Sequence, residues 1–480
     1  MTVSHVVRGR MLNPRADGSV DYSSDAAIIG DDRGRIVAFG SWNDLSAQFG
    51  SAVQGFRRAG GLIIPPMLDA HIHIPQHPIR GRFLEGIIGS PEGGPLLAGL
   101  NRNVFPAETL CADTALARRA IEDFRDDTLS HGVVGGAAYM TVHTPATRAA
   151  LELLADTWGV GLVLMQRFCP PTLRTDELTL DEDIASLAAD FGARVIVTDR
   201  FAGAVDTPLR RRAVAIATRH ELRMQTHLNE QLAEKAWIES LYPEAASYTD
   251  VYRRDNLLDR APILAHCIRM SPAEHDMLAA ATQTGAAAAH CPVSNTLLGS
   301  GVMYLDEIVS RDVPYAICTD VGASPTTSLL CEMLQFLRVH RGRSRLATPQ
   351  EALFRTTLAP AQILGLADRV GSFEPGKDFS FVEVAATSKI AAADGAAAAS
   401  ADAVILTDLL DAGDDDLRRY EPGGELGKLV DELAVTGLPV GSSLSELTTD
   451  VERTARRLDA KIVRVTLEGR VAFSRGRDTV

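Results

Sequence analysis

The chain has 480 residues, of which 46% are hydrophobic, and a formal net charge of −14 at pH 7. Its length and apolar content predict a large buried core, either in two to three domains or in one barrel with an accessory unit. The acidic balance argues against a nucleic-acid or anionic-membrane partner, because both require a basic surface. A small neutral ligand fits this composition better.

The beginning of the sequence, MTVSHVVRGRMLNPRADG, contains no apolar stretch of signal-peptide length, and no later run approaches the ~18 apolar residues of a membrane span. Six cysteines are scattered through the chain without the spacing of a disulfide framework. We therefore predict a protein of the cytoplasm, where thiols stay reduced.

Short β-like pieces occur at both ends of the chain. Residues 1–64 contain several, and residues 369–384 and 461–474 resemble them. Because neither flank is long enough to build a good core alone, residues 1–64 and 368–480 are expected to pair into one small β-sandwich domain. The alanine-rich stretch AATSKIAAADGAAAASAD within the second flank is interpreted as a mobile loop or a weak surface helix without chemistry of its own.

Eight short apolar runs recur between about residues 61 and 320. They lie at 67–74, 133–140, 161–168, 194–201, 223–228, 262–267, 286–291 and 313–318. Segments with helical spacing, such as TALARRAIEDFRDDTLSHG, separate them. Apolar strands that alternate with helices predict the α/β class and a (β/α)8 TIM barrel over residues 65–367, in which both faces of each strand are buried.

Polar groups end these runs, in the segments HIHIPQ, MTVHT, QRFC, DRF, HLNE, HC, HCPVSN and TDVG. A polar residue can mark the end of any strand, and this simple interpretation suffices for one strand but not for all eight together. Barrel enzymes carry their active sites at the carboxyl ends of the strands. The pattern therefore predicts an active site at that end.

Five of these strand-end residues are candidate metal ligands. His71 and His73 are two apart on one strand, so their side chains share a face and can reach one ion. His227, His266 and Asp320 end later strands. Nitrogen and oxygen ligands of this kind suit Zn²⁺ or Fe²⁺ better than Mg²⁺ or Ca²⁺.

Glu230 follows His227 by three residues. It is either the first acidic residue of the next helix, where the helix dipole favours a negative charge, or a general acid and base beside a metal site. The pairing with His227 favours the second interpretation once a metal is accepted.

The order of HxH, two single histidines and an aspartate at strand ends resembles the amidohydrolase superfamily, as does the FEPGKD segment. Within this superfamily the chain is similar to the guanine deaminases over about residues 60–390. The shared segments are AHIHIPQ, PLLAGLNRNVFPAE, TVHT, VTDRF, THLNE, YTDVYRRDNLL, LAHC, HCPVSN and CTDVG.

This resemblance implies one zinc ion per subunit, with Fe²⁺ as an alternative. Its ligands would be His71, His73, His227 and Asp320. The resemblance further implies that His266 contacts the attacking water or the substrate, and that Glu230 and Asp320 transfer protons.

The implied substrate is a purine, and the implied reaction is the hydrolysis of guanine to xanthine and ammonia by attack at C2. Gln76 and Arg200 would bind the edge of the base, and Phe201 would cover its ring face. The habit of the family also suggests a homodimer.

The chain departs from the family pattern at several positions. Asp199 and Asn229 replace a usual proline and serine, Gly99 stands where a tryptophan is expected, and the loop of residues 78–95 is longer. The last two changes are expected to reshape the mouth of the pocket. They leave open a related aminated heterocycle, such as 8-oxoguanine or a pterin, as the substrate. A catalytically inactive assembly protein is the other alternative, against which the complete set of candidate ligands argues.

Overall fold

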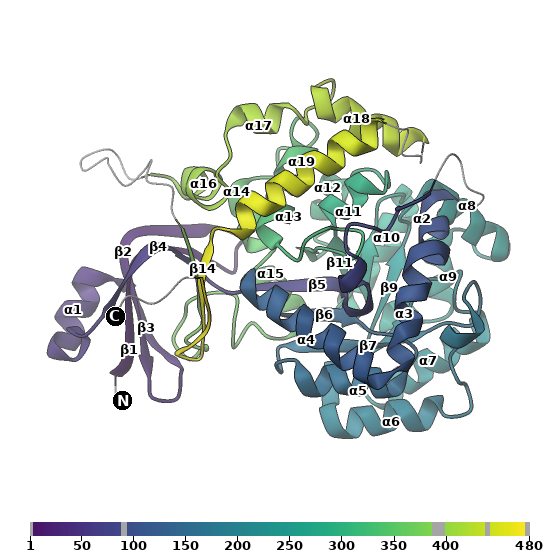
Figure 1. Ribbon diagram of the computed structural model, residues 1–480, viewed down its shortest axis with the longest axis horizontal. Helices are drawn as coiled ribbons and strands as arrows, with labels where there is room; N and C mark the ends of the chain where they lie inside the picture. Colours follow the sequence, from purple (N-terminus) through teal and green to yellow (C-terminus); the bar gives the residue numbers. More distant parts are fainter. Residues whose placement is uncertain (1–2, 88–93, 386–398, 437–441, 476–480) are drawn as a thin grey trace.

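Two sheets organise the chain, one of eight strands and one of seven (Figure 1). The computed structural model describes residues 3–87, 94–385, 399–436 and 442–475. The eight-stranded sheet is parallel and carries the candidate site, and the seven-stranded sheet lies beside it.

The parallel sheet confirms the predicted barrel, with neighbouring strands in chain order. Its strands are β5 (Met67–His73), β6 (Val133–Tyr139), β7 (Trp158–Leu164), β8 (Val195–Asp199), β9 (Arg223–Leu228), β10 (Ile263–His266), β11 (Ala287–His290) and β12 (Tyr315–Ile317). β7 and β8 end earlier than the apolar runs suggested, which leaves Arg200 and Phe201 in a loop at the end of β8. The predicted strand at β8 was too long because burial continues past its end: Arg200 and Phe201 are buried although they lie in the loop.

The ring of strands closes where the chain leaves β12 and meets β5. The backbone N–H of Asp320 donates to the carbonyl of His71 at 2.9 Å, and the N–H of His73 donates to the carbonyl of Val321 at 2.9 Å. These two bonds place the last candidate ligand directly beside the first two.

Helices surround the barrel and begin at residues that cap them. The side chain of Asp113 accepts hydrogen bonds from the first turn of α4 (Thr114–Ser130), and Ser271 and Glu274 form a reciprocal capping box at the start of α10 (Pro272–Ala281). The helices along the barrel are α2 (Gly94–Gly99), α3 (Phe105–Thr109), α4 (Thr114–Ser130), α5 (Thr144–Leu153), α6 (Leu180–Phe191), α7 (Thr207–Arg219), α8 (Leu232–Leu241), α9 (Tyr248–Arg254), α10 (Pro272–Ala281), α11 (Pro292–Leu297), α12 (Leu305–Val309), α13 (Leu329–His340), α14 (Pro349–Phe354) and α15 (Leu358–Leu364).

The second sheet takes strands from both ends of the chain, as predicted. In spatial order it contains β15 (Arg470–Ser474), β14 (Ile462–Leu467), β13 (Phe381–Val384), β4 (Arg57–Ile64), β1 (Val3–Pro14), β2 (Val20–Asp31) and β3 (Ile36–Ser41). The two ends join where β13 pairs with β4 in antiparallel register, Val382 opposite Ile64. Helix α1 (Trp42–Phe49) packs on this sheet through Leu45, which belongs to an apolar cluster with Ala27 and Ile29 of β2.

Between β13 and β14 the chain forms helices that the sequence analysis did not predict. They are α16 (Ala401–Val404), α17 (Asp414–Arg418), α18 (Glu425–Thr436) and α19 (Ser442–Asp459). Leu426, Val430 and Leu447 of this group pack in one cluster with Val293 of α11 and Val339 of α13. These helices therefore cover one side of the barrel (Figure 1). Most of the alanine-rich stretch, residues 386–398, lies outside the described residues.

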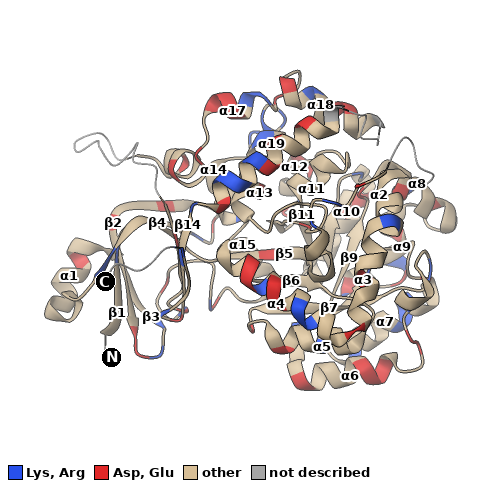
Figure 2. Ribbon diagram, viewed as in Figure 1, with Lys and Arg blue, Asp and Glu red and all other residues tan. Residues whose placement is uncertain are grey.

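Charged residues of both signs are interspersed on the outer helices, and acidic residues are prominent on α6 and α17 (Figure 2). This distribution agrees with the negative net charge. Among the helices of the described ranges, none combines the length and the apolar character needed to cross a bilayer.

Candidate active site

The strand ends of the barrel bring the predicted ligand residues together. His71 and His73 end β5, His227 lies near the end of β9, His266 ends β10, and Asp320 follows β12. All except the partly buried His227 are buried. The sequence separates these residues by up to 249 positions, and the closure of the barrel removes that separation.

The ligand atoms lie within reach of a single ion. Nε2 of His71 is 3.2 Å from Oδ1 of Asp320, and Nε2 of His73 is 3.1 Å from the same oxygen. One ligand atom from each of His71, His227, His266 and Asp320 lies within 4.8 Å of the others. His266, which was not a predicted ligand under the family resemblance, thus belongs to this compact group. The predicted ligand His73 lies outside it but contacts Asp320, which is a member.

The chemistry of this group fits a metal ion. Nε2 of His71 and Nε2 of His266 are buried and have no hydrogen-bond partner among the described residues, although such buried atoms normally have one. Burial lowers the pKa of His71 to about 4 and that of His227 well below its usual value. The rings are therefore neutral at pH 7, which is the form that binds metals. Burial alone would raise the pKa of Asp320, but the adjacent rings of His71 and His73 keep it well below its usual value, so the carboxylate is ionised.

Neighbouring acceptors orient two of the rings. Nδ1 of His227 donates to the backbone carbonyl of Arg200 at 2.6 Å, and Nδ1 of His266 donates to Oδ1 of Asn295 at 2.9 Å. Because a carbonyl oxygen only accepts, both bonds place a hydrogen on Nδ1, and in the neutral ring of His227 this leaves Nε2 with a lone pair. Such contacts fix ring orientation in metal sites.

Several residues at the site have a left-handed backbone. The φ angle is 73° at His266, 55° at Asp320 and 52° at Asn229. Residues other than glycine rarely take this conformation, and it concentrates at functional sites. Asparagine tolerates it better than most residues, which gives a physical reason for Asn229 in place of the expected serine.

Glu230 lies beside the metal-ligand group, with Oε2 3.5 Å from Nε2 of His266. The hydroxyl of Ser300 donates to its Oε1 at 2.9 Å, and its own backbone N–H donates to Oε2 of Glu234 at 2.9 Å. Burial raises the pKa of Glu230 to about 7, although His266 opposes the shift. A carboxyl group with this pKa can both accept and release a proton near neutral pH.

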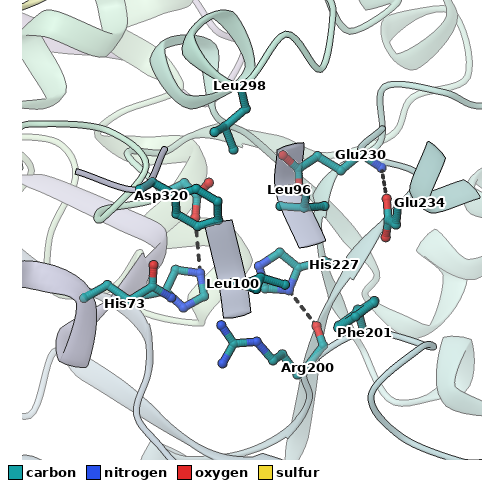
Figure 3. Close-up of a pocket in the computed structure, with 12 residues that line it drawn as sticks. His73, Leu96, Leu100, Arg200, Phe201, His227, Glu230, Glu234, Leu298 and Asp320 are labelled. Carbon is teal, nitrogen blue, oxygen red and sulfur yellow. Dashed lines mark hydrogen bonds and ion pairs between the residues drawn. The ribbon is translucent and has the colours of Figure 1, made fainter. Parts of the chain in front are cut away.

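Three of the four predicted substrate residues, Gln76, Arg200 and Phe201, line the same pocket as His73 and His227 (Figure 3). The fourth, His266, is not among the described residues that line it. In Figure 3 the guanidinium of Arg200 points into the space beside the rings of His73 and His227. The residues that line the pocket are His73, Gln76, Phe83, Leu96, Leu100, Arg200, Phe201, His227, Glu230, Glu234, Leu298 and Asp320. Apolar walls with a few convergent polar groups are typical of small-molecule sites.

Phe83 fills the position at which Gly99 was expected to enlarge the pocket. A Cβ atom added at Gly99 would lie 2.4 Å from Cε1 of Phe83, well inside contact distance. The ring of Phe83 therefore occupies the space that a larger side chain at position 99 would take. The sequence analysis missed Phe83, because nothing in the sequence relates the loop after β5 to helix α2.

Asp199, another departure from the family pattern, has a partner in Arg210 on α7. Nε of Arg210 donates to Oδ2 of Asp199 at 2.5 Å, and both side chains are fully buried. Arg210 also donates to Asp255 and to the carbonyls of Ala202 and Val205. This network anchors the loop that carries Arg200 and Phe201.

Glu108 is a second residue of the site that the sequence did not predict. Its carboxylate accepts hydrogen bonds from Nη1 of Arg200 at 2.6 and 2.7 Å and from the side-chain amide of Gln76 at 3.2 Å. It lies in the shared segment PLLAGLNRNVFPAE. The segment indicated that this part of the chain resembles the family, but it did not indicate that Glu108 contacts Arg200 and Gln76.

Comparison with known proteins matches residues 62–408 to the family described as Amidohydrolase family. The guanine deaminase of Escherichia coli (strain K12) is 29% identical over 73% of this chain and 79% of its own length. The probable guanine deaminase of Deinococcus radiodurans is 32% identical over 75% of this chain and 82% of its length. The guanine deaminase of Rattus norvegicus is 30% identical over 66% of this chain and 71% of its length.

Solved structures share the whole fold. A guanine deaminase from E. coli superposes with a TM-score of 0.74 at 24% identity and covers 98% of this chain and 99% of its own. A guanine deaminase from C. acetobutylicum with bound guanine in its active site gives a TM-score of 0.74 at 21% identity, over 98% of this chain and all of its own. At these identities the likeness concerns the fold.

Proposed function

The chain belongs to the amidohydrolase family, and we propose that it is a zinc-dependent guanine deaminase, a hydrolase of C–N bonds in cyclic amidines. One observation carries the proposal. Gln76, Arg200 and Phe201 line the same pocket as His73, His227, Glu230 and Asp320. Groups suited to bind a flat, polar heterocycle thus lie beside groups suited to activate water.

His71, His73, His227 and Asp320 would hold the zinc ion, with Fe²⁺ as the alternative, and His266 would contact the attacking water or the substrate. Zinc bound there supplies Lewis acidity that lowers the pKa of water towards about 7. The lone pairs on Nε2 of the buried rings and the ionised Asp320 are what this donor set offers to a divalent cation.

Glu230 and Asp320 move the protons of the reaction. Both carboxylates lie at the pocket, and the raised pKa of Glu230 suits a group that first accepts the proton of water and then releases it. Glu230 delivers a proton to a ring nitrogen, which makes C2 electrophilic, while the water oxygen bonds to C2. A second proton, from the hydroxyl now on C2, passes through the carboxylates to the amino group. The C2–N bond then breaks, and xanthine and ammonia leave.

The polar edge of the base meets Gln76 and Arg200, and its face meets Phe201. Arg200 can only donate hydrogen bonds, which suits the 6-carbonyl oxygen of guanine. Phe201 is 4% exposed and sits against Phe168 and Trp237, with ring centroids 6.3 and 6.0 Å away. Its ring is therefore held in place to pack on the purine.

Release of ammonia from guanine by the zinc-loaded protein, together with formation of xanthine, tests the proposal. No ammonia from guanine, with zinc bound and the protein folded, would reject it. Phe83 fills the space beside Gly99, so the enlarged pocket that motivated a larger heterocycle is not formed. The alternative of an inactive assembly protein is also disfavoured, because Glu230 and the candidate ligands lie together at one site.

We propose further that the protein acts as a homodimer in the cytoplasm. All six cysteines are unpaired thiols, as expected in a reducing compartment. Sedimentation equilibrium would test the dimer, and metal analysis of the purified protein would distinguish zinc from iron.

A further inference from the structure

The side chain of Glu108 is 2% exposed, carries a formal negative charge, and contacts both residues proposed to bind the edge of the substrate. We propose that Glu108 positions Arg200 and Gln76 and thereby selects purines that have a carbonyl oxygen at C6 and a hydrogen on N1. This inference rests on the guanine deaminase function proposed above. Glu108 does not line the pocket within the described residues, so it acts through its two neighbours.

Glu108 holds Arg200 from one side. Nη1 of Arg200 donates to both carboxylate oxygens of Glu108, at 2.7 and 2.6 Å, and the guanidinium carbon lies 5.4 Å from the ring centroid of Phe105. Both charged side chains are almost fully buried, at 3% and 2% exposure. Glu108 thus engages Nη1, whereas Nη2 makes no hydrogen bond within the described part of the chain. Because Arg200 lines the pocket, its Nη2 can donate to the substrate.

Glu108 also orients the amide group of Gln76. The NH₂ of Gln76 donates to Oε1 of Glu108 at 3.2 Å, which turns the amide oxygen away from the carboxyl group. That oxygen accepts a hydrogen bond from the backbone N–H of Gly322 at 3.4 Å. Because an amide oxygen has two lone pairs and Gln76 lines the pocket, the second lone pair is available to accept from the substrate.

Together these contacts present one donor and one acceptor to the base. Guanine offers the complementary pair, an acceptor at O6 beside a donor at N1–H. In 2-aminopurine, C6 carries only hydrogen and N1 carries a lone pair, so neither contact forms. The carboxylate of Glu108 orients both groups at once, and for this reason one residue controls the choice between the two bases.

The test compares kcat/KM for guanine with kcat/KM for 2-aminopurine, whose amino group is also at C2. In Glu108→Gln we expect the guanine to 2-aminopurine ratio to fall about tenfold or more, mainly through KM for guanine, while 2-aminopurine turnover falls less. In an Arg200→Met/Gln76→Leu background the same change should leave the ratio nearly unaltered, because both positioned groups are gone. Glu152→Gln, an exposed residue paired with Arg118, is the matched control.

Parallel loss of activity on both substrates in Glu108→Gln would show a merely structural role and overturn the inference. If Glu108→Gln does not fold, as thermal melting would reveal, Glu108→Asp takes its place, because it keeps the charge and withdraws the carboxylate by one methylene. An unchanged ratio in Glu108→Asp would likewise overturn the inference. Binding of xanthine to the wild-type protein by calorimetry separates the two proposals. If the wild-type protein neither deaminates guanine nor binds xanthine, the proposed function and this inference both fail. If it deaminates guanine and binds xanthine while the ratio is insensitive to Glu108, only this inference fails.

Discussion

Oε2 of Glu230 lies 3.5 Å from Nε2 of His266, so a carboxyl group with a raised pKa adjoins the candidate metal ligands. The hydroxyl of Ser300 holds the other oxygen of the same carboxyl group. This fixed position is what a group needs if it is to move protons between water and a bound base.

Replacement of Glu230 by glutamine should remove this proton transfer without disturbing the fold. We expect kcat for ammonia release to fall by about 10²–10⁴-fold, the range typical of general acid–base groups. Zinc content should remain near that of the wild type, because Glu230 is not a proposed ligand. Glu239→Gln makes the same chemical change at an exposed helical position and serves as the control. Retention of more than a tenth of the activity in Glu230→Gln would contradict the proposed role.

Removal of the metal should abolish activity reversibly. After dialysis against a chelator we expect no ammonia release, a lower melting temperature, and recovery of both on addition of Zn²⁺, because an ion that binds only the folded state stabilises it. His71→Asn should lower the zinc content from about one per chain towards zero. His220→Asn on the partly exposed end of α7 is the matched control. If His71→Asn leaves the zinc content unchanged, the proposed set of ligands is wrong.

The contact between Phe83 and Gly99 should restrict what can be placed at position 99. In Gly99→Trp the new side chain meets the ring of Phe83, so we expect at least a tenfold loss of kcat/KM for guanine. The double variant Gly99→Trp/Phe83→Ala should recover only part of that loss, because it removes the clash with the ring and leaves the backbone oxygen of Phe83, 2.9 Å from the added Cβ. Steady-state kinetics on the three proteins would check this, and a double variant no better than Gly99→Trp would show that Phe83 is not the obstacle.

The buried pair Asp199 and Arg210 should contribute strongly to stability. Removal of one partner leaves the other charge buried without compensation, so Arg210→Met is expected to lower the free energy of unfolding by about 3–5 kcal/mol. Urea unfolding followed by fluorescence would measure the change. The surface pair Arg118 and Glu152 provides the comparison, because Arg118→Met should change stability by less than about 1 kcal/mol. Equal effects at the two sites would contradict the argument.

Glu274 should make stability depend on pH in the acid range. Burial alone would raise its pKa, but hydrogen bonds from Lys235, Ser271 and Asn229 outweigh burial and lower it to about 2. A carboxyl group whose pKa is lower in the folded state stabilises the fold above its unfolded pKa and loses this contribution as the pH falls towards its folded value. Between about pH 4.5 and pH 2, the wild type should therefore lose about 2 kcal/mol more than Glu274→Gln. Denaturant unfolding of the two proteins at a series of pH values would check the sign, and parallel curves would refute it.

The barrel and its ligand residues could be predicted because each strand is apolar along its length and polar at its carboxyl end. The position of a histidine at a strand end depends on the local sequence alone, so His227 and His266 were found. Contacts such as Glu108 with Arg200, or Phe83 with Gly99, depend on how loops fold over the barrel. No local pattern encodes them. The helices around Leu426 and Val451 were missed because their apolar residues are interspersed with a long acidic and alanine-rich stretch that reads as surface.

The pairing of β4 with β13 also bears on how the protein is made. Strand β4 ends at Ile64, and its neighbour begins at Phe381, so the whole barrel is synthesised between them. At roughly 5–20 residues per second, the edge of β4 waits about half a minute on the ribosome for its partner. Its last residues, Leu62, Ile63 and Ile64, are fully buried in the finished protein and stay uncovered for that time. An unpaired apolar edge of this kind invites aggregation between nascent chains, so the yield of active protein will depend on how well that edge is shielded during translation.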